Sequence, residues 1–275
     1  MTTESTNPET IGLHGGTFRR DESQTSVAVP IHQTTSFQFN SAEHAANLFG
    51  LKEFGNIYTR IMNPTTNTLE ERVAALEGGA AGLCVSSGQA ASAFVVQNLC
   101  SAGDNIVAST DLYGGTVNLF SNTLKSMGVE VRYADPSDPK NFEKLIDDKT
   151  RLFYAEVLPN PSLRVFPIKE VADIGRPHGI PLIVDNTACP VICKPIEHGA
   201  AIVMHSLTKF IGGHGNSIGG IIVDSGNFDW SVKKERQPNI WQPDPSYHGA
   251  VWGDAVPQLT GANIPFAIRA RVVLL

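Results

Sequence analysis

The sequence contains few residues of the kinds that mark secreted, membrane-spanning or metal-binding proteins. Only four of its 275 residues are cysteine, and the spacing of Cys189 and Cys193 matches neither a zinc site nor a C-x-x-C redox motif. No apolar run approaches the roughly 20 residues needed to cross a bilayer, and the polar N-terminus has no basic-then-apolar signal pattern. We therefore expect reduced, mostly buried thiols, no metal site and a cytoplasmic location.

An excess of positive charge is also missing. The chain has 21 Lys and Arg against 27 Asp and Glu, a formal net charge of −6, and its basic residues are scattered. Nucleic acids and anionic membranes are bound by clustered positive charge, so neither is expected as a partner. With 41% hydrophobic and 17% charged residues, the composition excludes a disordered or collagen-like chain. The length suffices for one large α/β domain or two smaller ones.

The chain does contain a regular alternation of apolar strands and helical segments, which follows a polar arm. Residues 1–65 have little periodicity, and we expect an extended arm that lies on a partner subunit. From Thr66 the spacing of Leu69, Val73 and Leu76 predicts a helix. The alternation beyond it is typical of a mostly parallel sheet flanked by helices, whose ligands lie beyond the carboxyl ends of the strands. The expected strands are 82–86, 105–109, 129–133, 152–156, 181–185, 201–205 and 218–224, and the expected helices are 88–99, 116–127, 141–146 and 168–176.

Three regions follow from this pattern. The arm occupies 1–65, and residues 66–260 are expected to form the ligand-binding sheet domain. Residues 261–275 are expected to begin a helix that leads into a further, C-terminal domain absent from this sequence, because the segment 268–275 has a helical pattern without a capping residue.

A lysine beside one expected strand end carries the most chemical information. Lys209 comes just after an apolar strand, follows Ser206 and Thr208, and precedes a glycine-rich loop. A lysine that is desolvated at such an edge has a lowered pKa and acts as a nucleophilic amine. For a single lysine, a surface position on a flexible turn is the commoner case, so the interpretation depends on its neighbours.

Other segments converge on the same edge. Gly88 and Gln89 follow Ser87 at an expected helix start, where free backbone N–H groups and the helix dipole favour a phosphate. Asp185 ends one apolar strand, and Tyr113 follows another, where it could stack on a planar ring. Taken singly, a serine-capped helix start is more often only a structural device, and a partly buried tyrosine is more often a core residue. Asp185 alone could equally cap the next turn. Together, an amine, a phosphate cradle, a carboxylate and an aromatic ring are what pyridoxal 5′-phosphate (PLP) requires.

These motifs resemble those of the Cys/Met-metabolism family of fold-type I PLP-dependent enzymes, and the resemblance extends from Leu13 to Gly249. It implies that Lys209 is the Schiff-base lysine and proton shuttle. It also implies that Asp185 pairs with the pyridine nitrogen and that Tyr113 stacks on the ring. The implied phosphate ligands are Gly88, Gln89, Ser206 and Thr208.

The resemblance also covers the segment 58–65, Y-T-R-I-M-N-P-T. In relatives the Tyr and Arg of this motif reach the phosphate of a neighbouring subunit. The resemblance therefore implies that Tyr58 and Arg60 bind that phosphate, and that Tyr58 is also a catalytic residue. The planar fork of Arg60 suits a bidentate phosphate contact. A homo-oligomer, a dimer with shared sites or a tetramer, is therefore expected. Asn160 matches a residue that holds the substrate carboxylate, with Glu156 as a supporting residue.

Within the family, the segments 60–63, 209–215, 224–230 and 245–249 most resemble those of O-acetylhomoserine sulfhydrylases. This implies γ-replacement of acetate on O-acetyl-L-homoserine by sulfide or a small thiol, giving homocysteine or methionine. Two alternatives stay open: a cystathionine γ-synthase or methionine γ-lyase activity, and a non-catalytic PLP-binding fragment, since the family's carboxylate-gripping arginine lies in the C-terminal domain. The nucleophile and the acyl leaving group are also open. A nucleotide-binding domain is disfavoured because neither G-x-x-x-x-G-K-[ST] nor a strand-linked G-x-G-x-x-G is present.

Overall fold

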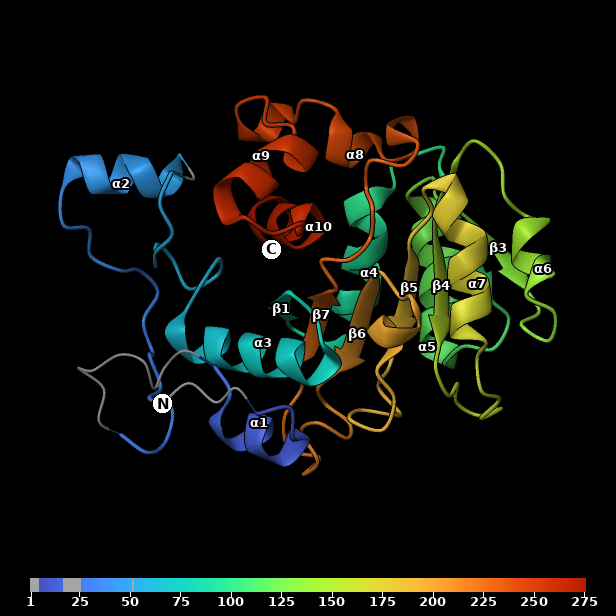
Figure 1. Cartoon of the computed structure of the whole chain (residues 1–275), viewed down its shortest axis with the longest axis horizontal. Coiled ribbons are helices and arrows are strands. Elements are labelled where there is room, and N and C mark those ends of the chain that lie inside the picture. Colours follow the sequence, from blue (N-terminus) through green and yellow to red (C-terminus); the bar gives the residue numbers. More distant parts are fainter. Residues whose placement is uncertain (1–4, 17–25, 51) are drawn as a thin grey trace.

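Seven short strands pair in the order β1-β7-β6-β5-β4-β2-β3 (Figure 1). The computed structural model describes residues 5–16, 26–50 and 52–275. The strands from β2 to β6 pair in parallel, and β7 is antiparallel to both of its neighbours. The prediction of a mostly parallel sheet flanked by helices is confirmed. The strands are β1 (Ala81–Val85), β2 (Asn105–Ser109), β3 (Glu130–Ala134), β4 (Thr150–Glu156), β5 (Leu182–Asp185), β6 (Ile202–Ser206) and β7 (Gly220–Asp224).

The helices follow the predicted alternation, with differences in length. The helix predicted at 88–99 has these bounds, whereas the one predicted at 116–127 begins at Gly114 and continues as a π-helix, Leu119–Leu124. The helix predicted at 141–146 is a single turn. The α-helices are α1 (Pro8–His14), α2 (Ala42–Phe49), α3 (Pro64–Glu77), α4 (Gly88–Leu99), α5 (Gly114–Asn118), α6 (Lys140–Glu143), α7 (Ile168–Gly175), α8 (Pro238–Trp241), α9 (Trp252–Thr260) and α10 (Pro265–Arg269), and a second π-helix is Ala270–Leu274.

The two faces of the sheet pack against different helices. On one face, Ile202 and Met204 of β6 join a core with α4, α8 and α10. On the other face, Val203 of β6 joins a core with α3, α6 and α7. Because side chains alternate along a strand, Ser206 falls on the α4 face and His205 on the α3 face. By the same alternation, Asp185 at the end of β5 falls on the α4 face with Ser206.

The buried face of α3 contains charged as well as apolar side chains. Of the apolar residues whose spacing predicts this helix, Leu69 is 38% exposed and Val73 is buried. The carboxylates of Glu70 and Glu77 are also buried. They replace apolar residues because each has a partner: Arg271 binds Glu70, and His205 contacts Glu77.

The N-terminal arm contains two short helices that periodicity does not reveal. Asn7 caps α1, and Ser41 caps α2; each cap accepts a backbone N–H, as such residues commonly do at helix starts. Figure 1 shows α2 standing away from the sheet. The described residues of the arm outside these helices are mostly extended or irregular, and the large apolar side chains of Ile31 and Phe54 are exposed.

The four cysteines are free thiols, as predicted: Cys100 and Cys189 are buried, and Cys84 and Cys193 are half-buried. Over the described residues, no helix combines the length and apolar character that a membrane crossing requires. Those residues also contain no cluster of three or more His, Cys, Asp or Glu side chains able to hold a metal ion.

Candidate active site

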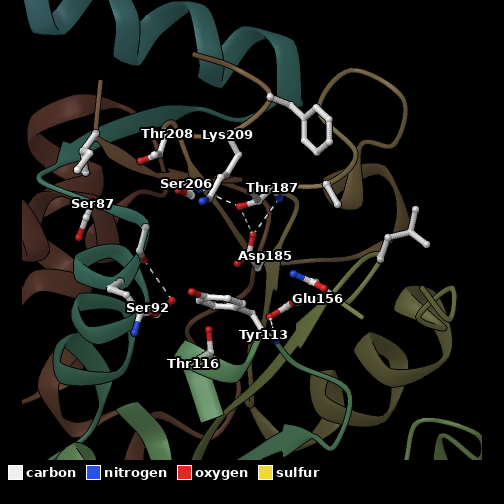
Figure 2. A pocket seen from close by; sticks show the side chains of 17 residues that line it. Ser87, Ser92, Tyr113, Thr116, Glu156, Asp185, Thr187, Ser206, Thr208 and Lys209 are labelled. Atoms are coloured by element: carbon white, nitrogen blue, oxygen red, sulfur yellow. Dashed lines mark hydrogen bonds between the residues drawn. The ribbon is translucent and has the colours of Figure 1, made fainter. Parts of the chain in front are cut away.

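A pocket of about 420 Å³ lies at the carboxyl ends of β4, β5 and β6, next to the start of α4 (Figure 2). Parallel strands gather ligands at this edge of a sheet. Eight of the ten predicted site residues line the pocket, although they come from distant parts of the chain. They are Gly88, Gln89, Tyr113, Asn160, Asp185, Ser206, Thr208 and Lys209.

The first turn of α4 forms one wall of the pocket. The Ser87 side chain caps the helix by accepting a hydrogen bond from the Ala90 N–H, 3.0 Å away. The N–H groups of Gly88 and Gln89 have no acceptor within the described part of the chain. A Cβ on Gly88 would lie 2.6 Å from the Ser206 Cβ, so only glycine allows α4 and β6 to approach this closely. The result is a helix start with two free donors, an arrangement that binds anions such as phosphate.

Thr187 connects the strand ends that carry Asp185 and Ser206. Asp185 Oδ1 accepts hydrogen bonds from the Thr187 N–H, 2.9 Å away, and from the Thr187 hydroxyl. The same hydroxyl oxygen accepts a hydrogen bond from the Ser206 N–H at 2.8 Å. Burial raises the pKa of Asp185, and the Thr187 hydrogen bonds oppose that rise. No described group donates to Oδ2, so Asp185 offers one free oxygen to a ligand.

Lys209 extends into the pocket beside Ser206 and across from the ring of Tyr113 (Figure 2). The expectation that Lys209 is desolvated is wrong for the described chain, because its side chain is exposed. It lies on the open side of the pocket, where Phe210 and Ile218 are also largely exposed. The amine is therefore accessible within the described part of the chain.

Glu156 supports the Tyr113 loop from the end of β4. Its Oε1 accepts a hydrogen bond from the Tyr113 N–H at 2.6 Å, and Glu156 pairs in register with Asp185 on β5. Burial and the neighbouring Asp185 charge raise the pKa of Glu156 to about 8. The Glu156 carboxyl is thus mostly neutral at pH 7, as an acid beside a second buried carboxylate should be.

This pKa predicts how stability changes with pH. Between pH 4.5, the ordinary pKa of Glu, and pH 8, unfolded Glu156 loses its proton while folded Glu156 keeps it. The folded state then binds more protons, so the free energy of unfolding falls as pH rises through this window. Glu156→Gln keeps the Oε1 acceptor and removes the titration. The variant should lose less stability than the wild type between pH 5 and 8, by on the order of 1 kcal/mol or more.

Denaturant unfolding at several pH values measures this difference. Glu143→Gln, an exposed substitution on α6, is the control and should follow the wild type. Parallel pH curves for the wild type and Glu156→Gln would show that Glu156 ionises normally.

Tyr58 and Arg60 lie outside this pocket. Tyr58 forms an isolated β-bridge with Ser36 and is 42% exposed. Arg60 donates a hydrogen bond to the Leu275 carbonyl and lines a separate cavity of about 240 Å³ with Arg271. The structure of a single chain therefore does not bring them to the other eight residues. Their roles at a neighbouring subunit stay predictions.

The pocket also contains residues that the sequence did not indicate. Thr187 is the most important of these, and its position two residues after a strand-ending Asp is a turn pattern in which hydroxyls often bond to the Asp. Ser92, one helical turn after Gly88, donates to the Gly88 carbonyl. The remaining unpredicted lining residues are Thr116, Leu158, Ala188, Phe210 and Ile218.

Comparisons with known proteins agree with this geometry. The family Cys/Met metabolism PLP-dependent enzyme matches residues 9–256. O-acetyl-L-homoserine sulfhydrylase from Leptospira meyeri is 54% identical over 270 residues, which cover 96% of this chain and 60% of the relative. Homocysteine/cysteine synthase from Saccharomyces cerevisiae is 46% identical over 270 residues, 97% of this chain and 60% of the relative. The chain thus spans about 60% of the length of these curated relatives.

A solved structure shows the same fold. The chain aligns, with a TM-score of 0.89 and 38% identity, to a Campylobacter jejuni protein described as an O-acetylhomoserine (thiol)-lyase, over 97% of this chain and 65% of that one. The crystal structure of that protein contains N′-pyridoxyl-lysine-5′-monophosphate.

Proposed function

The chain belongs to the Cys/Met metabolism family of PLP-dependent enzymes, and we propose that it catalyses γ-replacement on O-acetyl-L-homoserine. Acetate leaves, and sulfide or a small thiol takes its place, giving homocysteine or methionine. The observation that carries this proposal is the pocket in which Lys209, Asp185 and the free N–H groups of α4 meet. The substrate class comes from the names of the relatives.

The residues of the pocket fit PLP. The free N–H groups of Gly88 and Gln89, with the hydroxyls of Ser206 and Thr208, would hold its phosphate, and a Cβ at position 88 would collide with Ser206. The half-exposed ring of Tyr113 would cover its face. When bound, PLP supplies an electron sink for negative charge on the substrate carbon.

The side chains around that group have separable roles. Asp185 would hold a proton on the pyridine nitrogen, because burial makes its own charge costly and a positive partner offsets the cost. The flexible Lys209 amine would take a proton from the substrate Cα and then one from Cβ as acetate leaves Cγ. It would return protons to these carbons after the nucleophile has added to Cγ. The Asn160 amide would bind the substrate carboxylate.

One comparison of substrates tests the proposal. PLP-loaded protein should form homocysteine from O-acetyl-L-homoserine and sulfide, and should not break down methionine alone. Breakdown of methionine would indicate a methionine γ-lyase, and cystathionine formed with cysteine would indicate a cystathionine γ-synthase. A chain that binds PLP but converts none of these substrates would be a cofactor-binding fragment.

We further propose a cytoplasmic homo-oligomer built from dimers with shared sites, and a tetramer as a pair of such dimers. The positions of Tyr58 and Arg60 outside their own pocket support the shared site. Exposed apolar side chains along the arm, such as Ile31 and Phe54, support a partner surface, because a segment with little core of its own gains burial on another subunit.

Subunit mixing tests the shared site. Lys209→Ala should be inactive alone because it lacks the amine that would bond to the cofactor and move the substrate's protons. Arg60→Ala should be inactive alone at limiting PLP, because losing one charge-assisted phosphate contact costs about 1.5 to 3 kcal/mol of cofactor binding. After exchange, a mixed dimer has one site with both lesions and one with neither. An equal mixture should therefore regain up to about a quarter of wild-type activity.

Each variant mixed with itself is the control, and co-purification of differently tagged subunits shows that exchange took place. A mixture that exchanges and stays inactive would mean that Arg60 serves its own chain.

A further inference from the structure

A fully buried polar cluster lies behind the pocket, on the α3 face of the sheet. It consists of Glu77, Asn186 and His205, which are 3%, 0% and 0% exposed. His205 Nε2 lies 2.6 Å from Glu77 Oε1, and Asn186 Nδ2 donates a hydrogen bond to the same oxygen at 2.8 Å. No role proposed above uses these side chains.

The cluster sits directly behind two pocket residues. Asn186 follows Asp185 at the end of β5, and His205 precedes Ser206 at the end of β6. Because side chains alternate, Asn186 and His205 each point to the opposite face from their neighbours in the pocket. Glu77 is the last residue of α3, so the end of this helix binds both strand ends at once.

Stability alone does not explain such a cluster. Glu77 Oε2, Asn186 Oδ1 and His205 Nδ1 are buried without a hydrogen-bond partner within the described part of the chain. Unpaired buried polar atoms cost free energy, and replacing a buried ion pair by well-packed apolar residues is often neutral or stabilising. Apolar side chains fill most of the space on both faces of this sheet, so apolar residues would suit these positions too.

We propose that the Glu77–Asn186–His205 cluster positions Asp185 and Ser206 for the cofactor by fixing the ends of β5 and β6 from behind. This inference rests on the proposed function. Thr187 ties the same two strand ends on the pocket side, so the cluster and Thr187 hold them from opposite faces. His205 also acts electrostatically to lower the pKa of Asp185, against the larger effect of burial.

The double variant Glu77→Met/His205→Leu tests positioning separately from stability. It removes both partners and fills the space with apolar atoms, while Asn186 keeps its 2.9 Å hydrogen bond to the Cys193 carbonyl. PLP should bind to the variant roughly ten- to a hundredfold more weakly than to the wild type, a loss like that seen at metal sites when groups that orient the metal's ligands are removed. The circular dichroism of the bound cofactor should change, because it reports the orientation of the ring.

The Arg151–Asp104 pair supplies a matched control. It has the same 2.6 Å separation and similar burial, but Asp104 and Arg151 lie at the amino ends of β2 and β4, away from the pocket. Asp104→Asn should lower the free energy of unfolding of the cofactor-free protein and leave PLP affinity and circular dichroism unchanged.

The outcomes separate the two proposals. A folded double variant with wild-type PLP affinity and circular dichroism would overturn the positioning role. If the double variant does not fold, Glu77→Gln is judged by the same two measurements, since it removes the charge and keeps an amide oxygen. A wild-type chain that binds no PLP would overturn the proposed function itself, and the positioning role with it.

Discussion

The Lys209→Ala variant should fold normally, bind PLP only non-covalently and lose turnover by roughly 10²-fold or more. The fold should survive because the Lys209 side chain is exposed and its amine makes no hydrogen bond or ion pair with any described residue. The covalent bond should disappear because the amine that forms it is gone. Turnover should fall because the same amine would move the substrate's protons.

Borohydride reduction followed by intact mass measurement detects the covalent bond directly. The wild type should retain the mass of the reduced cofactor after denaturation, and Lys209→Ala should not. Lys169→Ala is a suitable control, since Lys169 pairs with Asp173 on the surface of α7 and lies outside the pocket. A reducible adduct in Lys209→Ala would assign the covalent bond to another lysine.

Replacement of Asp185 should separate cofactor binding from catalysis. Asp185→Ala should retain PLP through the phosphate contacts but lose turnover by roughly 10²-fold or more. A pyridine nitrogen without a carboxylate partner is mostly neutral, and a neutral ring withdraws less charge from the substrate carbon.

Asp185→Asn is the matched variant because its amide oxygen can still accept the two Thr187 hydrogen bonds that Oδ1 now accepts. Both variants should be slow when saturated with PLP, as measured by kcat and by bound cofactor absorbance. Full turnover in Asp185→Asn would mean that the carboxylate charge is not required.

Local signals made much of this fold predictable. Apolar runs located the seven strands, and the Ser87 cap with Gly88 located α4 to the residue. The two helices of the arm escaped prediction because α1 and α2 are short and bury only Ile11 and Leu48, too few for a periodic signal.

The candidate site was predictable where residues follow strands, and less so where contacts join distant segments. Asp185 and Ser206 end apolar strands, so their meeting at one edge follows from the parallel order. The exposure of Lys209 depends on which distant segments of the chain pack over it, and the residues next to Lys209 in the sequence do not indicate those contacts. Likewise Glu77 and His205 are 128 positions apart, and only the packing of α3 on the sheet brings them together.

The Thr187 hydroxyl accepts one hydrogen bond and donates another, so the hydrogen bonds that join the ends of β5 and β6 all run from Ser206 toward Asp185. An amide N–H can only donate, so the Ser206 N–H uses an oxygen lone pair of Thr187, and the single hydroxyl hydrogen must point to Asp185 Oδ1. Oδ1 also accepts the Thr187 N–H, so it is surrounded by donors and cannot itself carry a hydrogen toward them. Any proton that Asp185 exchanges with a ligand must therefore pass through Oδ2. The Ser206 N–H at the end of β6 thus determines, through the Thr187 hydroxyl, which of the two carboxylate oxygens can exchange a proton.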